Sequence, residues 1–287
     1  MTYEETTNPL RGVEARVGEG HYGIFDHGAH AWAYQPKGQQ HPVLWLSQKS
    51  EFAEGAPIRG GIPVVFPWFG AGPDGRLDPK HGFARLDTWH RSDLKDTVEA
   101  DGRLLVEYEL DDAMDHRDFP YDYTAYLLAK FTPEYLQVGL QVTNDGTEPF
   151  TFESALHTYL AVSDIRQITL DGLDGCSYLD RASGAQQLEC TQSGPVAFSG
   201  ETDRVYAHRG SVVLNDPVWG RRLEISKQGS ASTIVWNPWS EICARMPDLG
   251  DDEWTGMVCV EAGNVLDDAI TLLPGQTHTL RQRITLL

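Results

Sequence analysis

Apolar and polar residues alternate along several stretches of this chain. Between residues 135 and 143, Leu136, Val138, Leu140 and Val142 are separated by Gln, Gly, Gln and Thr. The stretches 104–110 and 123–131 are equally rich in alternating apolar positions, and a Thr-Pro-Glu turn joins 123–131 to 135–143. A period of two residues is typical of a strand with one buried and one solvated face. We therefore predict an antiparallel hairpin over 123–143 and a further strand over 104–110.

Shorter apolar runs, separated by turn residues, continue through the rest of the chain. We expect strands in two pieces of 21–34 around a turn at 26–28, and at 43–47, 150–162, 168–170, 212–214, 222–226, 233–236, 257–261, 270–273 and 278–286. One short helix is predicted over 239–246, with Asn237 as its cap and Pro238 in its first turn. Many short strands and few helices predict an all-β fold, a large antiparallel β-sandwich with one or two short helices. Since composition does not change along the chain, residues 1–287 are expected to form a single domain.

The net charge of this chain argues against some classes of binding partner. Its 287 residues carry a formal net charge of -19, so its mean field repels nucleic acid and anionic membrane surfaces. An anionic ligand would need a local basic pocket. The first ten residues are polar and acidic, unlike a secretory signal, and no window approaches the roughly 20 apolar residues that cross a bilayer. We expect a soluble, cytoplasmic monomer whose four cysteines, which lack CxxC spacing, stay reduced.

The stretch 56–85 combines two arginines with a stiff apolar run. Arg59 precedes two glycines, residues 62–69 contain prolines and aromatic rings, and Arg85 ends the segment His-Gly-Phe-Ala-Arg that begins at His81. Guanidinium groups held beside a rigid element suit bidentate recognition of phosphate or carboxylate. The alternative is that both arginines are solvated loop residues in weak surface ion pairs, and that the aromatic run is ordinary core.

Two polar residues, His157 and Glu261, lie within apolar strand runs. A carboxylate buried without partners costs several kcal/mol, so Glu261 is expected to be bonded or chemically active. An imidazole and a carboxylate brought together form an acid and base pair near neutral pH. The alternative is a satisfied core histidine and a strand-end glutamate paired with an arginine, with Asp203 an ordinary turn acid. His27 and His30 lack a third ligand at matching spacing, and the chain has no nucleotide or metalloprotease motif, so no metal or cofactor is expected.

Taken together, six segments resemble the hexose-6-phosphate mutarotases (glucose-6-phosphate 1-epimerases) of the aldose 1-epimerase, galactose-mutarotase-like group. They occur in the family's order and cover most of the chain after residue 29: IRGGIP with PWFG (58–70), HGFAR (81–85), ALHTY (155–159), ETDR (201–204), VWNPW (235–239) and VCVE (258–261). The resemblance implies a β-supersandwich and an isomerase that interconverts the α and β anomers of an aldohexose 6-phosphate, a small-molecule substrate.

The resemblance also implies roles for single residues. His157 is expected to be the general acid that protonates the ring oxygen, and Glu261 the general base that takes the anomeric hydroxyl proton. The expected substrate contacts are Arg59 and Arg85 for phosphate and sugar, Asp203 for a hydroxyl, and His81 beside them. Lys80 stands where relatives often have Gln or another uncharged residue, so either the contact there differs or Lys80 adds a second positive charge near the phosphate.

Three other functions remain open from the sequence. The same chemistry could act on unphosphorylated aldoses, or the chain could be a sugar-phosphate binding protein without turnover. A glycoside hydrolase would use Glu261 and Asp203 as a carboxylate pair roughly 5 to 10 Å apart in an oligosaccharide cleft. A His and Glu pair flanked by arginines suits a small anionic sugar better than an oligosaccharide.

Overall fold

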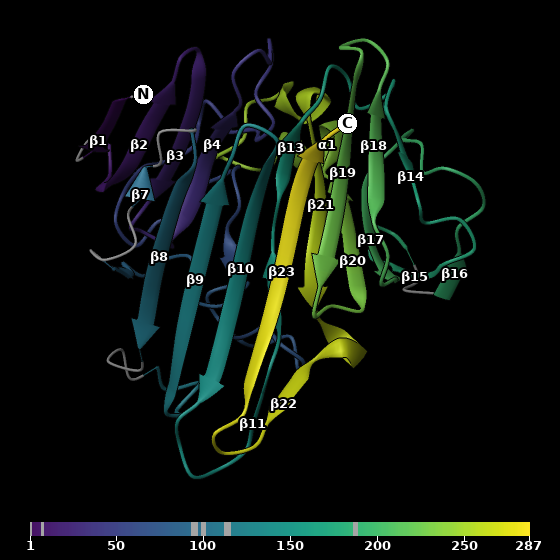
Figure 1. The fold of residues 1–287 in the computed structure, drawn as a ribbon. Helices are drawn as coiled ribbons and strands as arrows, with labels where there is room; N and C mark the ends of the chain where they lie inside the picture. Colours follow the sequence, from purple (N-terminus) through teal and green to yellow (C-terminus); the bar gives the residue numbers. More distant parts are fainter. Residues whose placement is uncertain (1, 7–8, 93–96, 99–101, 112–115, 186–188) are drawn as a thin grey trace.

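The computed structural model describes residues 2–6, 9–92, 97–98, 102–111, 116–185 and 189–287. In these ranges the chain is almost entirely antiparallel β-structure, organised in two large sheets and two small ones (Figure 1). This confirms the predicted all-β antiparallel sandwich. The described helices are short, and none has the length and apolar character needed to cross a membrane.

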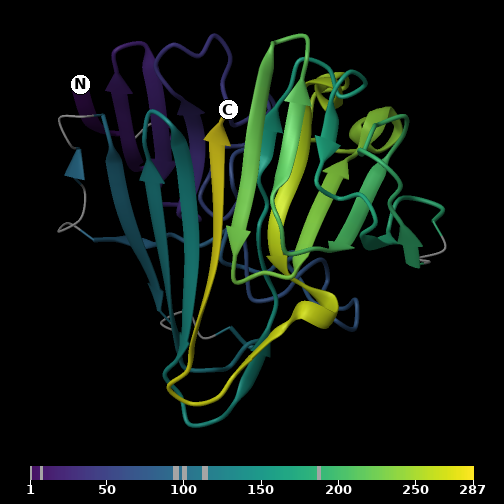
Figure 2. The same ribbon diagram turned by 45° about the vertical axis from the view of Figure 1, so that its right-hand side comes forward.

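The larger sheet has nine described strands. Its order is β14 (Thr169–Asp171), β18 (Val212–Asp216), β19 (Arg221–Gln228), β23 (Thr277–Leu286), β10 (Tyr135–Asn144), β9 (Tyr123–Phe131), β8 (Leu104–Asp111) and β6 (His90–Arg91), with β7 (Thr97–Val98) paired to β8. In β9 every second residue is buried, as period-two alternation predicts. The C-terminal strand β23 therefore closes the sheet between β10 and β19 (Figure 2).

The second large sheet has eight described strands. Its order is β16 (Glu189–Thr191), β15 (Ser177–Asp180), β17 (Thr202–Ala207), β20 (Ser232–Asn237), β21 (Met257–Asn264), β12 (Ser154–Leu156) and β5 (Val64–Val65), with β13 (Tyr159–Ala161) paired to β21. One small sheet has four strands in the order β1 (Thr2–Thr6), β2 (Gly12–Val17), β3 (Gly20–Phe25) and β4 (His30–Gln35). The other small sheet pairs β11 (Phe150–Phe152) with β22 (Ile270–Leu272).

The main core lies between the two large sheets, and one polar side chain crosses it. Val258, Val260 and Ala262 of β21 belong to this core, together with the inward side chains of β8, β9 and β10. From β23, the buried amide of Gln282 donates a hydrogen bond to the carbonyl oxygen of Val260 at 2.9 Å and accepts one from the hydroxyl of Thr158. Gln282 thus connects the nine-stranded sheet to residues adjacent to both Glu261 and His157.

Several predicted elements differ from the structure. The strand expected at 43–47 is wrong: Leu44 and Leu46 form only isolated bridges, to Leu160 of β13 and to Gly60, so the segment lies beside β13 without continuous strand pairing. The helix expected over 239–246 is shorter, α1 (Trp239–Cys243), followed by single-turn helices η1 (Glu253–Gly256) and η2 (Leu266–Asp268). The run 150–162 is divided into three strands. The single-domain expectation stays a prediction.

Candidate active site

The eight-stranded sheet brings side chains from three neighbouring strands, β17, β20 and β21, to one face. Register pairs Asp203 of β17 with Trp236 of β20, and Trp236 with Cys259 of β21, so these three side chains form a row across the sheet. Glu261 lies two residues beyond Cys259 and therefore projects from the same face. Alternation along neighbouring strands thus brings residues distant in sequence to one surface.

His157 comes to this surface from the segment between β12 and β13. Its Nδ1 lies 3.4 Å from Oε1 of Glu261, and both side chains are almost fully buried. Within the described residues, neither His157 Nδ1 nor Glu261 Oε2 has a hydrogen-bond partner. The imidazole stacks on the ring of Tyr159 with centroids 4.8 Å apart, which fixes its plane. The structure therefore brings the predicted acid and base together.

Burial pushes both members of this pair toward their neutral forms. Loss of solvation raises the pKa of Glu261 well above its ordinary value, and the nearby Asp203 raises it further, while Arg181 opposes this shift. Loss of solvation also lowers the pKa of His157, with His81 acting in the same direction. The pair consequently favours holding one proton, and moving that proton from the carboxyl to the imidazole creates the acid and the base at once.

A pocket of about 440 Å³ opens in front of this pair. It is lined by His157, Glu261, Asp203, His81, Lys80, Arg181, Trp236, Phe69 and Glu153, together with the glycine-rich loop around residues 70–75. His81 has a φ of 67°, a strained conformation for a residue other than glycine, as is common at functional sites. Gly70 N–H donates to its Nδ1 at 3.4 Å, so we assign the proton of the neutral ring to Nε2.

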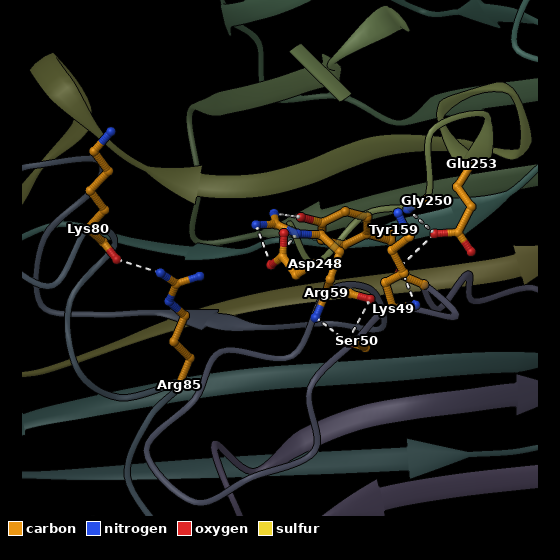
Figure 3. A network of polar contacts seen from close by, with 10 residues as sticks. Lys49, Ser50, Arg59, Lys80, Arg85, Tyr159, Asp248, Gly250 and Glu253 are labelled. Atoms are coloured by element: carbon orange, nitrogen blue, oxygen red, sulfur yellow. Dashed lines mark hydrogen bonds and ion pairs between the residues drawn. The ribbon is translucent and has the colours of Figure 1, made fainter. Parts of the chain in front are cut away.

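Arg59 is held by two partners rather than free at the pocket. Its Nε donates to Asp248 at 3.0 Å, its Nη2 lies 2.9 Å from the same carboxylate oxygen, and its Nη1 donates to the Tyr159 hydroxyl at 2.8 Å (Figure 3). Burial works against the charged form, but Tyr159 and Asp248 outweigh it and raise the pKa of Arg59. Since Tyr159 also stacks on His157, Arg59 supports the imidazole from behind.

Arg85 has fewer partners. Its Nη2 donates to the carbonyl oxygen of Lys80 at 2.7 Å, and its Nε is buried without a hydrogen-bond partner among the described residues (Figure 3). Burial lowers the pKa of Arg85, and the nearby Arg59 lowers it further. Burial and these arginines also lower the pKa of His81 to about 3. The site thus concentrates positive charge in a chain whose overall charge is strongly negative.

The structure places four of the six predicted site residues on the pocket wall: His157, Glu261, His81 and Asp203. Arg59 and Arg85 are not wall residues, but both are close enough to lower the pKa of His157. The alternative that both arginines are solvated surface residues is wrong for Arg59, whose side chain is only 19% exposed. No sequence signal marks Arg181 as a pocket residue, because it follows the short strand β15, which has no clear alternation.

Three side chains could together bind a metal ion. The ligand atoms of His157, Cys259 and Glu261 lie within 4.8 Å of one another, and nitrogen, sulfur and oxygen donors suit Zn²⁺. Burial raises the pKa of the Cys259 thiol well above its ordinary value, and Glu261 adds to this. The thiol also packs against Tyr159 and Met257 in an apolar cluster. We therefore interpret Cys259 as a packing residue beneath the pair.

Comparison with known proteins identifies the class to which this fold and pocket belong. A solved structure from Salmonella typhimurium, provisionally assigned as a mutarotase, superposes with a TM-score of 0.86 at 26% identity, covering 99% of this chain and 96% of that one. The fold is thus galactose mutarotase-like. The family model for aldose 1-epimerase matches residues 16–285, and the chain belongs to this family.

Curated relatives agree with this assignment. A protein of Escherichia coli K12, provisionally named glucose-6-phosphate 1-epimerase, is 36% identical over 238 residues, which are 82% of this chain and 76% of that protein. A protein of the same name from Salmonella typhimurium LT2 is 34% identical over the same shares of each chain. The protein is accordingly an epimerase that interconverts sugar anomers, and the hydrolase alternative is set aside.

Proposed function

We propose that the protein interconverts the anomers of an aldohexose 6-phosphate, with glucose 6-phosphate as the type of substrate. The two curated relatives are provisionally named for this sugar phosphate. The observation that supports phosphate binding is Arg85, a partly buried cation whose Nε is buried and has no hydrogen-bond partner among the described residues. A buried guanidinium without a carboxylate gains most from an anionic ligand.

The reaction needs one proton donor and one acceptor. Glu261 takes the proton from the anomeric hydroxyl, and the electron pair of that O–H bond forms the C1 carbonyl as the bond from C1 to the ring oxygen breaks. The imidazole of His157 gives its proton to the ring oxygen. Rotation about the C1–C2 bond presents the other carbonyl face, and the same steps in reverse return both protons. The pair ends in its starting state.

The arrangement of charge orients the sugar in the pocket. In an aldohexose 6-phosphate, the ring oxygen is bonded to C5, which carries C6 and its phosphate. The phosphate therefore lies on the side of His157, where Arg59 and Arg85 act on the imidazole. Arg59 is already neutralised by Asp248, so Arg85 and the exposed Lys80 supply the charge that the phosphate meets. A dianion there also favours the imidazolium form of His157.

Substrate selectivity tests this proposal. NMR exchange between anomers should be measured with glucose 6-phosphate and with glucose for the wild type, for Arg85→Met and for Arg283→Met. Arg283 is an exposed arginine of β23, so its substitution removes the same charge far from the pocket. Loss of hydrogen bonds to a charged group corresponds to about 10- to 100-fold in kcat/KM. We expect that loss for Arg85→Met with glucose 6-phosphate and a small effect with glucose.

Arg283→Met should retain the wild-type preference for the phosphorylated sugar. If Arg85→Met lowers kcat/KM equally for both sugars, Arg85 does not bind the phosphate. If the wild type prefers glucose to glucose 6-phosphate, the free aldose is the substrate instead.

A further inference from the structure

Arg181 and Asp203 lie side by side at the Glu261 end of the pocket. The backbone N–H of Arg181 donates to the carbonyl oxygen of Asp203 at 2.7 Å and continues the pairing of β15 with β17. Directly paired residues project from the same face of a sheet, so both side chains face the pocket, which both of them line. The Arg181 guanidinium also lies 4.9 Å from the centroid of the Phe69 ring, which holds it against the wall.

These two side chains offer a donor and an acceptor that the described part of the protein leaves available. Nη1 of Arg181 is buried and has no hydrogen-bond partner there. Burial raises the pKa of Asp203, and Arg181 opposes this by stabilising the carboxylate. A hydroxyl group donates one hydrogen bond and accepts others, so one sugar hydroxyl can satisfy both side chains. A phosphate would be repelled by the carboxylate of Asp203.

The connectivity of the sugar ring indicates which hydroxyl lies next to Arg181 and Asp203. When Glu261 faces the anomeric hydroxyl and His157 faces the ring oxygen, C5 lies beyond His157 and C2 lies beyond Glu261. The charged groups that act on Glu261 are Asp203 and Arg181. We propose that Arg181 is a specificity residue for the 2-hydroxyl of the aldose: it donates to the oxygen of that hydroxyl, whose proton Asp203, the expected hydroxyl contact, accepts. This inference rests on the proposed function and adds the orientation of the sugar.

The test is a thermodynamic cycle that combines one substitution in the protein with a substrate that lacks the 2-hydroxyl. Anomer exchange is measured by NMR for wild type and Arg181→Met with glucose 6-phosphate and 2-deoxyglucose 6-phosphate. For the wild type, we expect kcat/KM to fall about 10- to 100-fold with the deoxy sugar, the range of a hydrogen bond to a charged group. Arg181→Met should show a similar loss with glucose 6-phosphate and little further loss with the deoxy sugar. Arg181→Lys should recover part of the discrimination.

A matched control is available one strand away. Arg204 of β17 follows Asp203 and projects from the opposite face, where its guanidinium lies 4.8 Å from the centroid of the Tyr178 ring. Arg204→Met removes the same charge from the same part of the sheet and should keep the full difference between the two sugars. Circular dichroism and the melting temperature identify any variant whose loss comes from misfolding, and the Lys variant then carries the test.

Four results would overturn this role of Arg181. Additive losses would show that Arg181 and the 2-hydroxyl act independently, and sensitivity to 3-deoxyglucose 6-phosphate instead would assign another hydroxyl. An Arg181→Met variant that loses only its preference for phosphorylated over free glucose would make Arg181 a phosphate contact. A wild type that exchanges glucose 6-phosphate and its 2-deoxy analogue equally fast would reject this role alone. A wild type that neither exchanges nor binds either sugar would reject the proposed function itself.

Discussion

Two long strands, β10 and β21, show how differently one fold treats its polar residues. In β10, buried residues alternate with partly exposed ones for most of its length, and the exposed positions are glutamine, threonine and tyrosine. In β21, all eight residues are buried, including Glu261. Water satisfies the polar side chains of β10 at no structural cost. Glu261 is buried away from solvent, and its Oε2 has no hydrogen-bond partner among the described residues.

This difference separates the residues that stabilise the fold from those that carry out the chemistry. A buried carboxyl without full hydrogen bonding costs free energy of folding, and proteins retain such groups where function needs them. The nine-stranded sheet stabilises the fold, and the eight-stranded sheet loses some of that stability at its pocket. Substitutions in the two strands should therefore affect activity and stability in opposite ways.

The largest expected effect is loss of activity in Glu261→Gln. Removing the base should lower kcat about 10³-fold or more, since general acid–base catalysis contributes about 10² to 10⁴. The same variant should be more stable than the wild type, by about 1 kcal/mol at pH 8. NMR exchange and thermal unfolding measure the two quantities on one sample.

The pH dependence of stability sharpens this prediction. Burial raises the pKa of Glu261 in the folded state, so above its ordinary value of 4.5 the unfolded chain loses this proton while the folded chain keeps it. The contribution of Glu261 to stability therefore falls as pH rises above that value. The advantage of Glu261→Gln should grow from pH 4 to pH 8, and an advantage that shrinks over this interval would contradict the assigned pKa shift.

The next effect is the loss of one limb of the pH profile in His157→Asn. For the wild type we expect a bell-shaped dependence of kcat/KM on pH, because the pair works only with one proton. Activity should fall in acid, where both groups are protonated, and in alkali, where neither is. His157→Asn should lower kcat/KM about 10² to 10³-fold and remove the limb that belongs to the imidazole. An unchanged bell shape would mean that another group supplies the proton.

In β10 we expect a substitution to lower stability without lowering activity. Leu140 is 1% exposed and packs in the main core. Leu140→Ala should lower the free energy of unfolding by about 2 to 5 kcal/mol through lost burial and a cavity. The enzyme that remains folded should keep its kcat, because β10 contributes no residue to the pocket wall. Urea unfolding and steady-state exchange at low temperature measure the two, and a selective loss of kcat would show that the sheets are coupled.

The smallest effect is expected at the neighbouring outward position. Gln141 is partly exposed and shares one long hydrogen bond, 3.3 Å, with the Thr279 hydroxyl. Gln141→Ala should change the free energy of unfolding by less than about 0.5 kcal/mol and leave kcat unchanged. A larger loss of unfolding free energy, measured in urea, would mean that this face of the sheet makes stabilising contacts beyond those with solvent.

The sequence predicted best where local rules dominate. Alternation of apolar and polar residues located β8, β9 and β10. Polar residues within apolar runs marked His157 and Glu261, whose side chains lie 3.4 Å apart in the folded chain. The sequence could not predict partners that only the folded chain brings together. Arg59 is bonded to Asp248, 189 positions further along, and nothing near either residue indicates this pairing.

Arg181 illustrates the other limit. It follows β15, a strand of four partly buried residues without the contrast between faces that marks a strand in sequence. Its position in the pocket depends on register with Asp203 across two strands, which single-residue patterns do not encode. The prediction at 43–47 was wrong for the opposite reason: its apolar residues look like a strand, but in the folded chain Leu44 and Leu46 form only isolated bridges to Leu160 and Gly60.

The amide of Gln282 has a consequence for when the enzyme becomes active during its synthesis. It lies on β23, which follows the other described strands in chain order, and joins Val260 and Thr158, the neighbours of the base and the acid. A nascent chain that has already formed the hairpin of β9 and β10 still lacks this link. Ribosome-bound enzyme should therefore remain inactive until β23 has left the exit tunnel.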